Sequence, residues 1–149
     1  MIKIITVCDS FKHFDESIKE YKKRLSKQVQ IIKLKPAKKS NQEEIKKQET
    51  LSIIEKLDKI SSFKILLSLE WKEMSTIEFS NFIDYKLQNY NEIVFIIWWV
   101  YGLDNIIKRF VDFELSLSKM TFTHIETVAI LLEQIYRIWT IKQGKSYHY

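Results

Sequence analysis

The residues with the clearest potential for chemistry lie in the last third of the chain, residues 116–149. His124 stands where a helix is expected to begin, and a histidine there could act as a general base or contact RNA. Tyr147 and His148 form an aromatic–histidine pair in a C-terminal tail, where it could contribute to a site if the tail docks. Both features also have structural explanations, because helix-start histidines often cap or pack and chain ends commonly fray.

Other candidate residues also have both a structural and a functional interpretation. Glu133 and Arg137 are four residues apart on a predicted helix, which is the spacing of an intrahelical ion pair. Aromatic residues could stack on nucleic-acid bases, but in such proteins they also fill cores and subunit interfaces. The aromatic residues concerned are Trp98, Trp99, Tyr101 and Trp139.

The sequence lacks the short motifs that define several common sites. It contains no glycine-rich dinucleotide fingerprint, P-loop, HExxH pair or CxxC pair. We therefore expect no Rossmann site, no P-loop and no metal site. Cys8 is the sole cysteine, so no intramolecular disulfide can form and a reducing compartment is expected.

The composition predicts a soluble protein that contacts neither a membrane nor a signal-peptide pathway. The chain has 149 residues, of which 46% are hydrophobic and 29% charged. Its net charge of +5 is compatible with contact to a polyanion such as RNA, although it can also serve solubility alone. The most apolar run, residues 93–101, is short against the about 20 residues of a membrane-spanning helix. No cleavable leader pattern is seen at the N-terminus, and we expect a cytoplasmic protein.

Apolar runs alternate with segments of helical periodicity along the whole chain. β-Branched and apolar runs predict strands at residues 2–7, 29–35, 63–69, 93–97 and 113–117. Helical spacing predicts helices at residues 15–27, from about 42 to 57, and at 75–90, 103–111 and 124–142. The order predicts an α/β fold with a mostly parallel sheet flanked by helices, as one domain over residues 1–149. The fourth strand is apolar throughout and is predicted to be central.

The helix predictions include caps and buried faces. Asp15 is placed to cap the first helix, and Ser75 with Glu78 forms the pattern of a capping box. Leu51 and Ile77 are assigned to buried helix faces. In sheets of this class ligands bind outside the carboxyl ends of the strands, which directs attention to the loops after residues 69, 97 and 117.

The motifs taken together resemble the RlmH family of SPOUT-type methyltransferases. The similarity covers essentially the whole chain and is strongest near the C-terminus. The matching segments are EYKKRL at 20–25, LSLSKMTF at 115–122, His124, LEQIYR at 132–137, Gly144 and the pair Tyr147-His148.

This resemblance implies an S-adenosylmethionine-dependent enzyme that methylates a pseudouridine in 23S ribosomal RNA, within the large subunit or the assembled ribosome. It also implies a SPOUT-type α/β fold with a C-terminal trefoil knot, and a homodimer. His124, Arg137, Tyr147 and His148 would be the catalytic residues or serve the RNA side. The cofactor-binding residues it implies are Leu69, Trp99, Gly102, Leu117, Ser118, Lys119, Met120, Thr121 and Phe122.

The chain departs from the family in the loop after the fourth strand. The family has I-G-G-x-x-G, whereas this chain has IWWVYG at 97–102, which keeps only Gly102 of the three glycines. Trp98 and Trp99 could fill the cofactor cleft, or swing out and stack on adenine or a partner, and we predict obstruction. The alternative function is a catalytically impaired relative that binds ribosomal RNA or ribosomes without methyl transfer.

Overall fold

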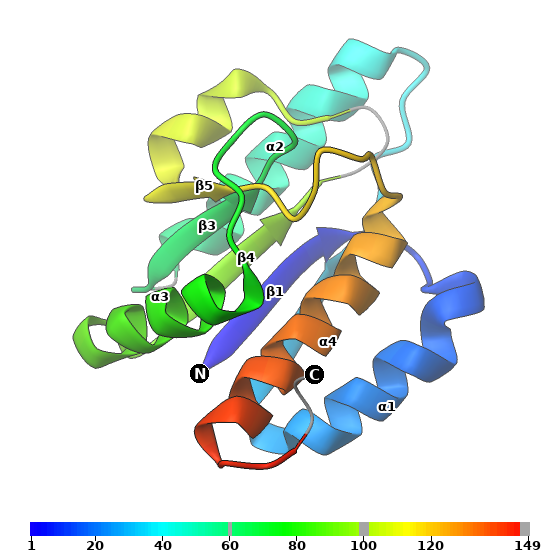
Figure 1. Ribbon diagram of the computed structural model, residues 1–149. Helices are drawn as coiled ribbons and strands as arrows, with labels where there is room; N and C mark the ends of the chain where they lie inside the picture. The colour runs from blue at the N-terminus through cyan, green and yellow to red at the C-terminus, as the bar shows by residue number, and fades with distance from the viewer. Residues whose placement is uncertain (60, 99–101, 147–149) are drawn as a thin grey trace.

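The computed structural model describes residues 1–59, 61–98 and 102–146, which form a parallel sheet with helices on both faces (Figure 1). The strands are β1 (Ile2–Val7), β2 (Val29–Leu34), β3 (Phe63–Leu67), β4 (Ile93–Ile97) and β5 (Phe113–Leu115). The α-helices are α1 (Asp15–Leu25), α2 (Gln42–Asp58), α3 (Thr76–Asn89) and α4 (His124–Lys142). Short 3₁₀ helices are η1 (Lys12–Phe14), η2 (Ser26–Gln28) and η3 (Asn105–Phe110).

The sheet is parallel in every pairing and has the order β2-β1-β4-β3-β5. β4 is the central strand, as predicted, and all its residues are buried. Phe95 in β4 lies beside Ile4 of β1 and Ile65 of β3. The α/β class and the mostly parallel sheet are therefore confirmed. β3 and β5 each end two residues earlier than predicted, at Leu67 and Leu115.

Alternating side chains of the strands build two separate core layers. Ile4 and Phe95 point to the face that α1, α3 and α4 cover. Ile5 and Ile96 point to the opposite face, where α2 and η3 pack. Because successive strand residues point to opposite sides, a strand between two helix layers must be apolar throughout. β4 has that composition.

Two of the helix starts were predicted with different success. Ser75 Oγ accepts the Glu78 backbone N–H at 3.2 Å, and Glu78 Oε2 accepts that of Ser75 at 2.8 Å, so the capping box is confirmed. The prediction for Asp15 is wrong, because Phe14 occupies the cap position without a side-chain bond. Asp15 is instead the first helical residue and forms an ion pair with Lys19.

The buried faces of two helices differ from the prediction. Leu51 is 60% exposed, and α2 instead buries Ile53 and Ile54. Ile77 is 46% exposed, and α3 instead packs Phe79 and other residues against the sheet. Both errors concern which side of the helix meets the sheet, while the helices themselves are present. The segment predicted as a helix at 103–111 forms the 3₁₀ helix η3.

Helix α4 has well-defined ends. Thr123 and Glu126 form a capping box at its start. At its end Gly144 has φ +64, its N–H donates to Ile141 O, and the Lys145 N–H donates to Thr140 O, which is a Schellman motif. No described helix has the length and apolar character needed to span a membrane. The trefoil knot implied by the family resemblance stays a prediction.

Candidate active site

The connections of β3 and β4 create a crevice at the carboxyl edge of the sheet. After β3 the chain leads to α3 on one face, whereas after β4 it leads to η3 on the other. Two neighbouring strands whose connections leave toward opposite faces form a topological switch point, where α/β proteins bind ligands. This edge was the one predicted from the sequence.

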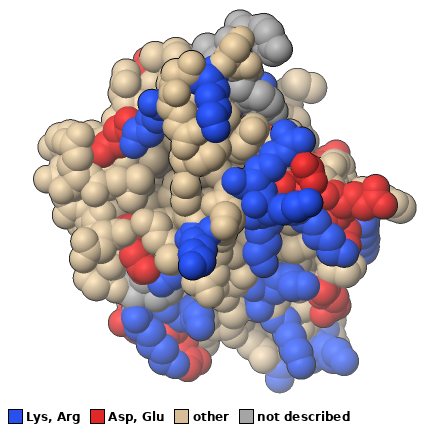
Figure 2. All heavy atoms as spheres, turned by 90° about the horizontal axis from the view of Figure 1, so that it is seen from below, with Lys and Arg blue, Asp and Glu red and all other residues tan. Residues whose placement is uncertain are grey.

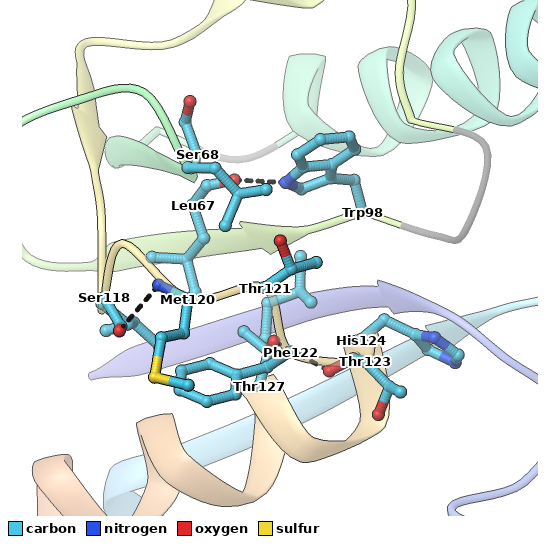
Figure 3. A pocket seen from close by; sticks show the side chains of 13 residues that line it. Leu67, Ser68, Trp98, Ser118, Met120, Thr121, Phe122, Thr123, His124 and Thr127 are labelled. Carbon is cyan, nitrogen blue, oxygen red and sulfur yellow. Dashed lines mark hydrogen bonds between the residues drawn. The ribbon is translucent and has the colours of Figure 1, made fainter.

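A cavity of about 460 Å³ opens at this point (Figure 3). Its walls come from the loops after β3, β4 and β5 and from the first turn of α4. Its volume falls within the roughly 300–1,000 Å³ typical of small-molecule sites. The lining residues are Leu67, Ser68, Leu69, Ile97, Trp98, Leu117, Ser118, Met120, Thr121, Phe122, Thr123, His124 and Thr127.

Hydrogen bonds tie the loops after β3 and β5 to each other. The Ser68 N–H donates to Leu115 O at 2.9 Å, and the Ser116 N–H donates to Lys72 O at 3.0 Å. Within the second loop, Ser116 Oγ donates to Ser118 O at 2.9 Å, while Ser118 Oγ accepts the Met120 N–H at 3.0 Å. Two walls of the cavity are thus preformed before any ligand binds.

Trp98 forms a further wall of the cavity. Its indole Nε1 donates a hydrogen bond to Leu67 O, which fixes the ring against the carboxyl end of β3. In Figure 3 the indole lies on one side of the cavity, with Met120 and Phe122 on the other. Trp98 therefore lines the cavity and leaves its volume open. Trp99, the second tryptophan of the predicted obstruction, lies outside the described residues.

Gly102 is the glycine that this position of Trp98 requires. Its φ of +79 lies in the left-handed region, which side chains with a Cβ disfavour. A Cβ added there would stand 3.0 Å from Trp98 Cζ3. The glycine therefore serves both the backbone conformation and the close approach of the indole.

His124 is the first residue of α4 and lines the cavity with part of its surface. It is 9% exposed. Burial lowers the pKa of its imidazole, and the positive charge of Lys12 lowers it further. At neutral pH the ring is therefore uncharged. In Figure 3 it extends away from Ser118 and Met120.

The structure gathers most of the predicted cofactor residues around this cavity. Those that line it are Leu69, Leu117, Ser118, Met120, Thr121 and Phe122. Lys119 is exposed and is not among the lining residues. Gly102 lines a neighbouring cavity on the other side of Trp98.

The predicted catalytic residues are not gathered at the same place. Arg137 lies on α4 roughly 20 Å from His124 along the helix axis, at 1.5 Å per residue. Its guanidinium donates to Glu133 Oε1 from Nε at 3.0 Å and from Nη2 at 2.6 Å, as expected for the intrahelical pair. Tyr147 and His148 lie outside the described residues.

Sequence reasoning missed several polar groups of the cavity. Ser68, Thr123 and Thr127 contribute hydroxyl groups to its lining. The pattern Thr-x-x-Glu at 123–126 is a capping box and could have identified Thr123 as the residue that starts α4. Ser68 and Thr127 carry no comparable pattern.

The composition of the walls favours an organic ligand over a metal ion. Leucine, methionine, phenylalanine and tryptophan side chains surround a few hydroxyls, as in sites for partly apolar molecules. Within the described part of the chain, no three His, Cys, Asp or Glu side chains are grouped so that they could hold a metal ion.

A family model described as "Predicted SPOUT methyltransferase" matches residues 1–148 of this chain. Among its similar relatives are three proteins named ribosomal RNA large subunit methyltransferase H. The one from Thermodesulfovibrio yellowstonii is 38% identical over 140 residues, covering 93% of this chain and 90% of its own. The one from Streptococcus suis is 36% identical over 157 aligned residues, covering 99% and 98%. The one from Pseudothermotoga lettingae is 35% identical over 152 residues, covering 99% of each chain.

Proposed function

This chain belongs to the SPOUT methyltransferase family, and we propose that it methylates ribosomal RNA of the large ribosomal subunit. The observation that carries the proposal is the cavity at the β3–β4 switch point, whose wall is the segment 117–122. The same segment is part of the resemblance to RlmH, so sequence and geometry indicate one site. Relatives named for this activity match nearly the whole length of the chain.

We propose S-adenosylmethionine as the methyl donor. The cavity has room for a nucleoside, and its apolar walls with Ser68, Ser118 and Thr121 fit an adenosine group. Leu69 and the segment 117–122 would hold the donor, with Trp98 in contact from the side. When bound, this cofactor supplies a methyl group carried on a positively charged sulfur. The chain's own contribution is to position that group and to exclude water from it.

The proposed acceptor is a pseudouridine of 23S ribosomal RNA, presented by the large subunit or the assembled ribosome. His124 is uncharged and half enclosed, so its role would be to position the base or to order the start of α4. Arg137 lies too far along α4 to reach the cavity of its own subunit. A homodimer would remove this difficulty, because Arg137, Tyr147 and His148 of one subunit could then serve the cavity of the other.

The charge of the molecule supports contact with RNA. Lysine and arginine side chains gather on the face where α1 and α4 end (Figure 2). Lys22, Lys23 and Lys27 are exposed there. Basic residues at helix C-termini also balance the helix dipole, so the face has a structural use as well. A ribosomal substrate places the protein in the cytoplasm.

A second function deserves a test because Trp98 and Trp99 replace family glycines. The chain would then keep the fold and bind ribosomes without transferring a methyl group. The open cavity beside Trp98 argues for the enzyme, since an indole that filled the site would leave no such volume.

Transfer of a labelled methyl group from S-adenosylmethionine tests the proposal. Ribosomes, large subunits and free 23S rRNA from cells that lack the modification are offered as acceptors. We expect incorporation approaching one methyl group per large subunit in at least one ribosomal acceptor. Binding to ribosomes without incorporation, by protein that is shown to be folded, would favour the second function.

A further inference from the structure

A second cavity of about 280 Å³ lies on the far side of Trp98 from the first. The two cavities share Leu67, Ser68, Leu69 and Trp98 as a common wall. The indole stands in this wall, held by its hydrogen bond to Leu67 O. The two spaces are therefore neighbouring compartments of one cleft at the carboxyl edge of the sheet.

The two compartments differ in chemistry. The first is lined by apolar and hydroxyl side chains, with His124 as its only ionisable residue among those described. The second contains charged side chains of both signs, together with an amide. Its polar lining residues are Lys46, Glu70, Asn105, Lys108 and Glu114, besides Ser68.

Glu114 has an unused acceptor in the second compartment. Its side chain is only 12% exposed. Oε2 is buried and accepts no hydrogen bond from any described residue. A carboxylate oxygen shielded from water without a donor is unfavourable, and a donor supplied by a ligand would remove that cost.

The nearby lysine does not satisfy Glu114 fully. Lys108 Nζ lies 3.4 Å from Glu114 Oε1, whereas Lys3 Nζ lies 2.7 Å from Glu92 Oε2 elsewhere in the same protein. A charge-assisted hydrogen bond of this kind is normally about 2.7–2.9 Å long. Both groups therefore retain capacity for a ligand of mixed charge.

We propose that the second compartment binds the amino-acid end of the methyl donor, with Glu114 accepting hydrogen bonds from the donor's ammonium group. Lys108 and Lys46 face the donor's carboxylate. The nucleoside occupies the first compartment, and the sulfur lies near the edge of the Trp98 indole that separates them. This assignment rests on the proposed function, since it presumes a donor of the S-adenosyl type.

Two ligands that differ only in the amino-acid end separate this role from a structural one. S-adenosylhomocysteine has both parts, whereas 5′-methylthioadenosine has the nucleoside and sulfur alone. Calorimetric titration measures both ligands against the unaltered protein, Glu114→Gln and Glu114→Asp. Glu55→Gln is the matched control, because this exposed carboxylate pairs with Lys59 and lines neither compartment.

We expect Glu114→Gln to weaken S-adenosylhomocysteine binding about 10-fold or more, the effect of losing a hydrogen bond between charged groups. Binding of 5′-methylthioadenosine should stay within about twofold of the unaltered protein. Glu114→Asp keeps the charge and should retain part of the lost affinity. The Glu55→Gln control should bind both ligands as the unaltered protein does.

Three outcomes would overturn the assignment. Unchanged S-adenosylhomocysteine binding in Glu114→Gln would exclude contact with the amino-acid end. An equal loss for both ligands would mean that Glu114 only supports the structure. Absence of S-adenosylhomocysteine binding to the unaltered protein would overturn the proposed donor itself, and the assignment with it.

Discussion

The contact between Gly102 and Trp98 gives the sharpest prediction, because the chain contains its own control. Gly102 and Gly144 both have a left-handed backbone, with φ of +79 and +64. A Cβ at Gly102 would lie 3.0 Å from Trp98 Cζ3 and 3.4 Å from Cε3, whereas one at Gly144 would meet nothing within 4 Å. Replacing each glycine by alanine thus imposes similar backbone strain, but only one of the two replacements presses on the indole.

The magnitudes follow from these contacts. Left-handed backbone costs an alanine roughly 1–2 kcal/mol, and this should be the whole effect of Gly144→Ala on the free energy of unfolding. Carbon atoms pack best at about 3.5–4.0 Å, so the alanine at Gly102 must displace a ring that is fixed by its bond to Leu67 O. Overpacking of this kind costs about 1–3 kcal/mol, which we expect as the additional loss in Gly102→Ala.

Urea denaturation of both variants measures the difference, in the unaltered protein and in a Trp98→Ala background. The additional cost of Gly102→Ala should largely disappear when the indole is absent, while the cost of Gly144→Ala should not change. The reasoning would be refuted if Gly102→Ala were no more harmful than Gly144→Ala. It would also be refuted if the additional cost persisted without the indole.

Three further predictions concern the cap of α4 and two buried ionisable groups. Thr123→Ala and Ser75→Ala each remove a capping box and should each lower stability by about 1 kcal/mol, but only Thr123→Ala, at the cavity wall, should also weaken donor binding by calorimetry; equal donor affinity in both would contradict the placement of the site. Burial raises the pKa of Glu49, so its stabilising effect is complete below its ordinary range and is lost as pH rises through the folded-state pKa; unfolding of Glu49→Gln should lack this decline, and matching pH profiles would disprove it. Burial lowers the pKa of His124, so stability should fall as pH drops through 6.5, and a His124→Gln variant that keeps the same acid limb would refute this origin.

Much of the fold could be predicted because the apolar runs carry the information directly. β4 is buried on both faces, so it is apolar at every position and its central place follows from composition. The faces of α2 and α3 were harder, because Leu51 and Ile77 are apolar yet exposed. Only the packing of each helix on the sheet decides which of several apolar residues turns inward.

The candidate site was predictable in its location but less so in its detail. The rule that ligands bind beyond the carboxyl ends of parallel strands indicates the loops that form the cavity. The position of the Trp98 indole depends on the Leu67 carbonyl, which the register between β3 and β4 places beside it. That register comes from tertiary pairing and is not encoded in the local sequence around Trp98. The distance from Arg137 to His124, by contrast, follows from helix geometry alone.

Calorimetric titration of the purified protein with S-adenosylmethionine and S-adenosylhomocysteine tests the central claim most directly, which is that the cavity beside Trp98 holds a methyl donor. We predict binding of both ligands at one site per chain, with an affinity that Glu114→Gln reduces for each. Absence of binding heat at several temperatures, from protein that is folded by circular dichroism, would contradict the claim and leave a SPOUT scaffold without its donor.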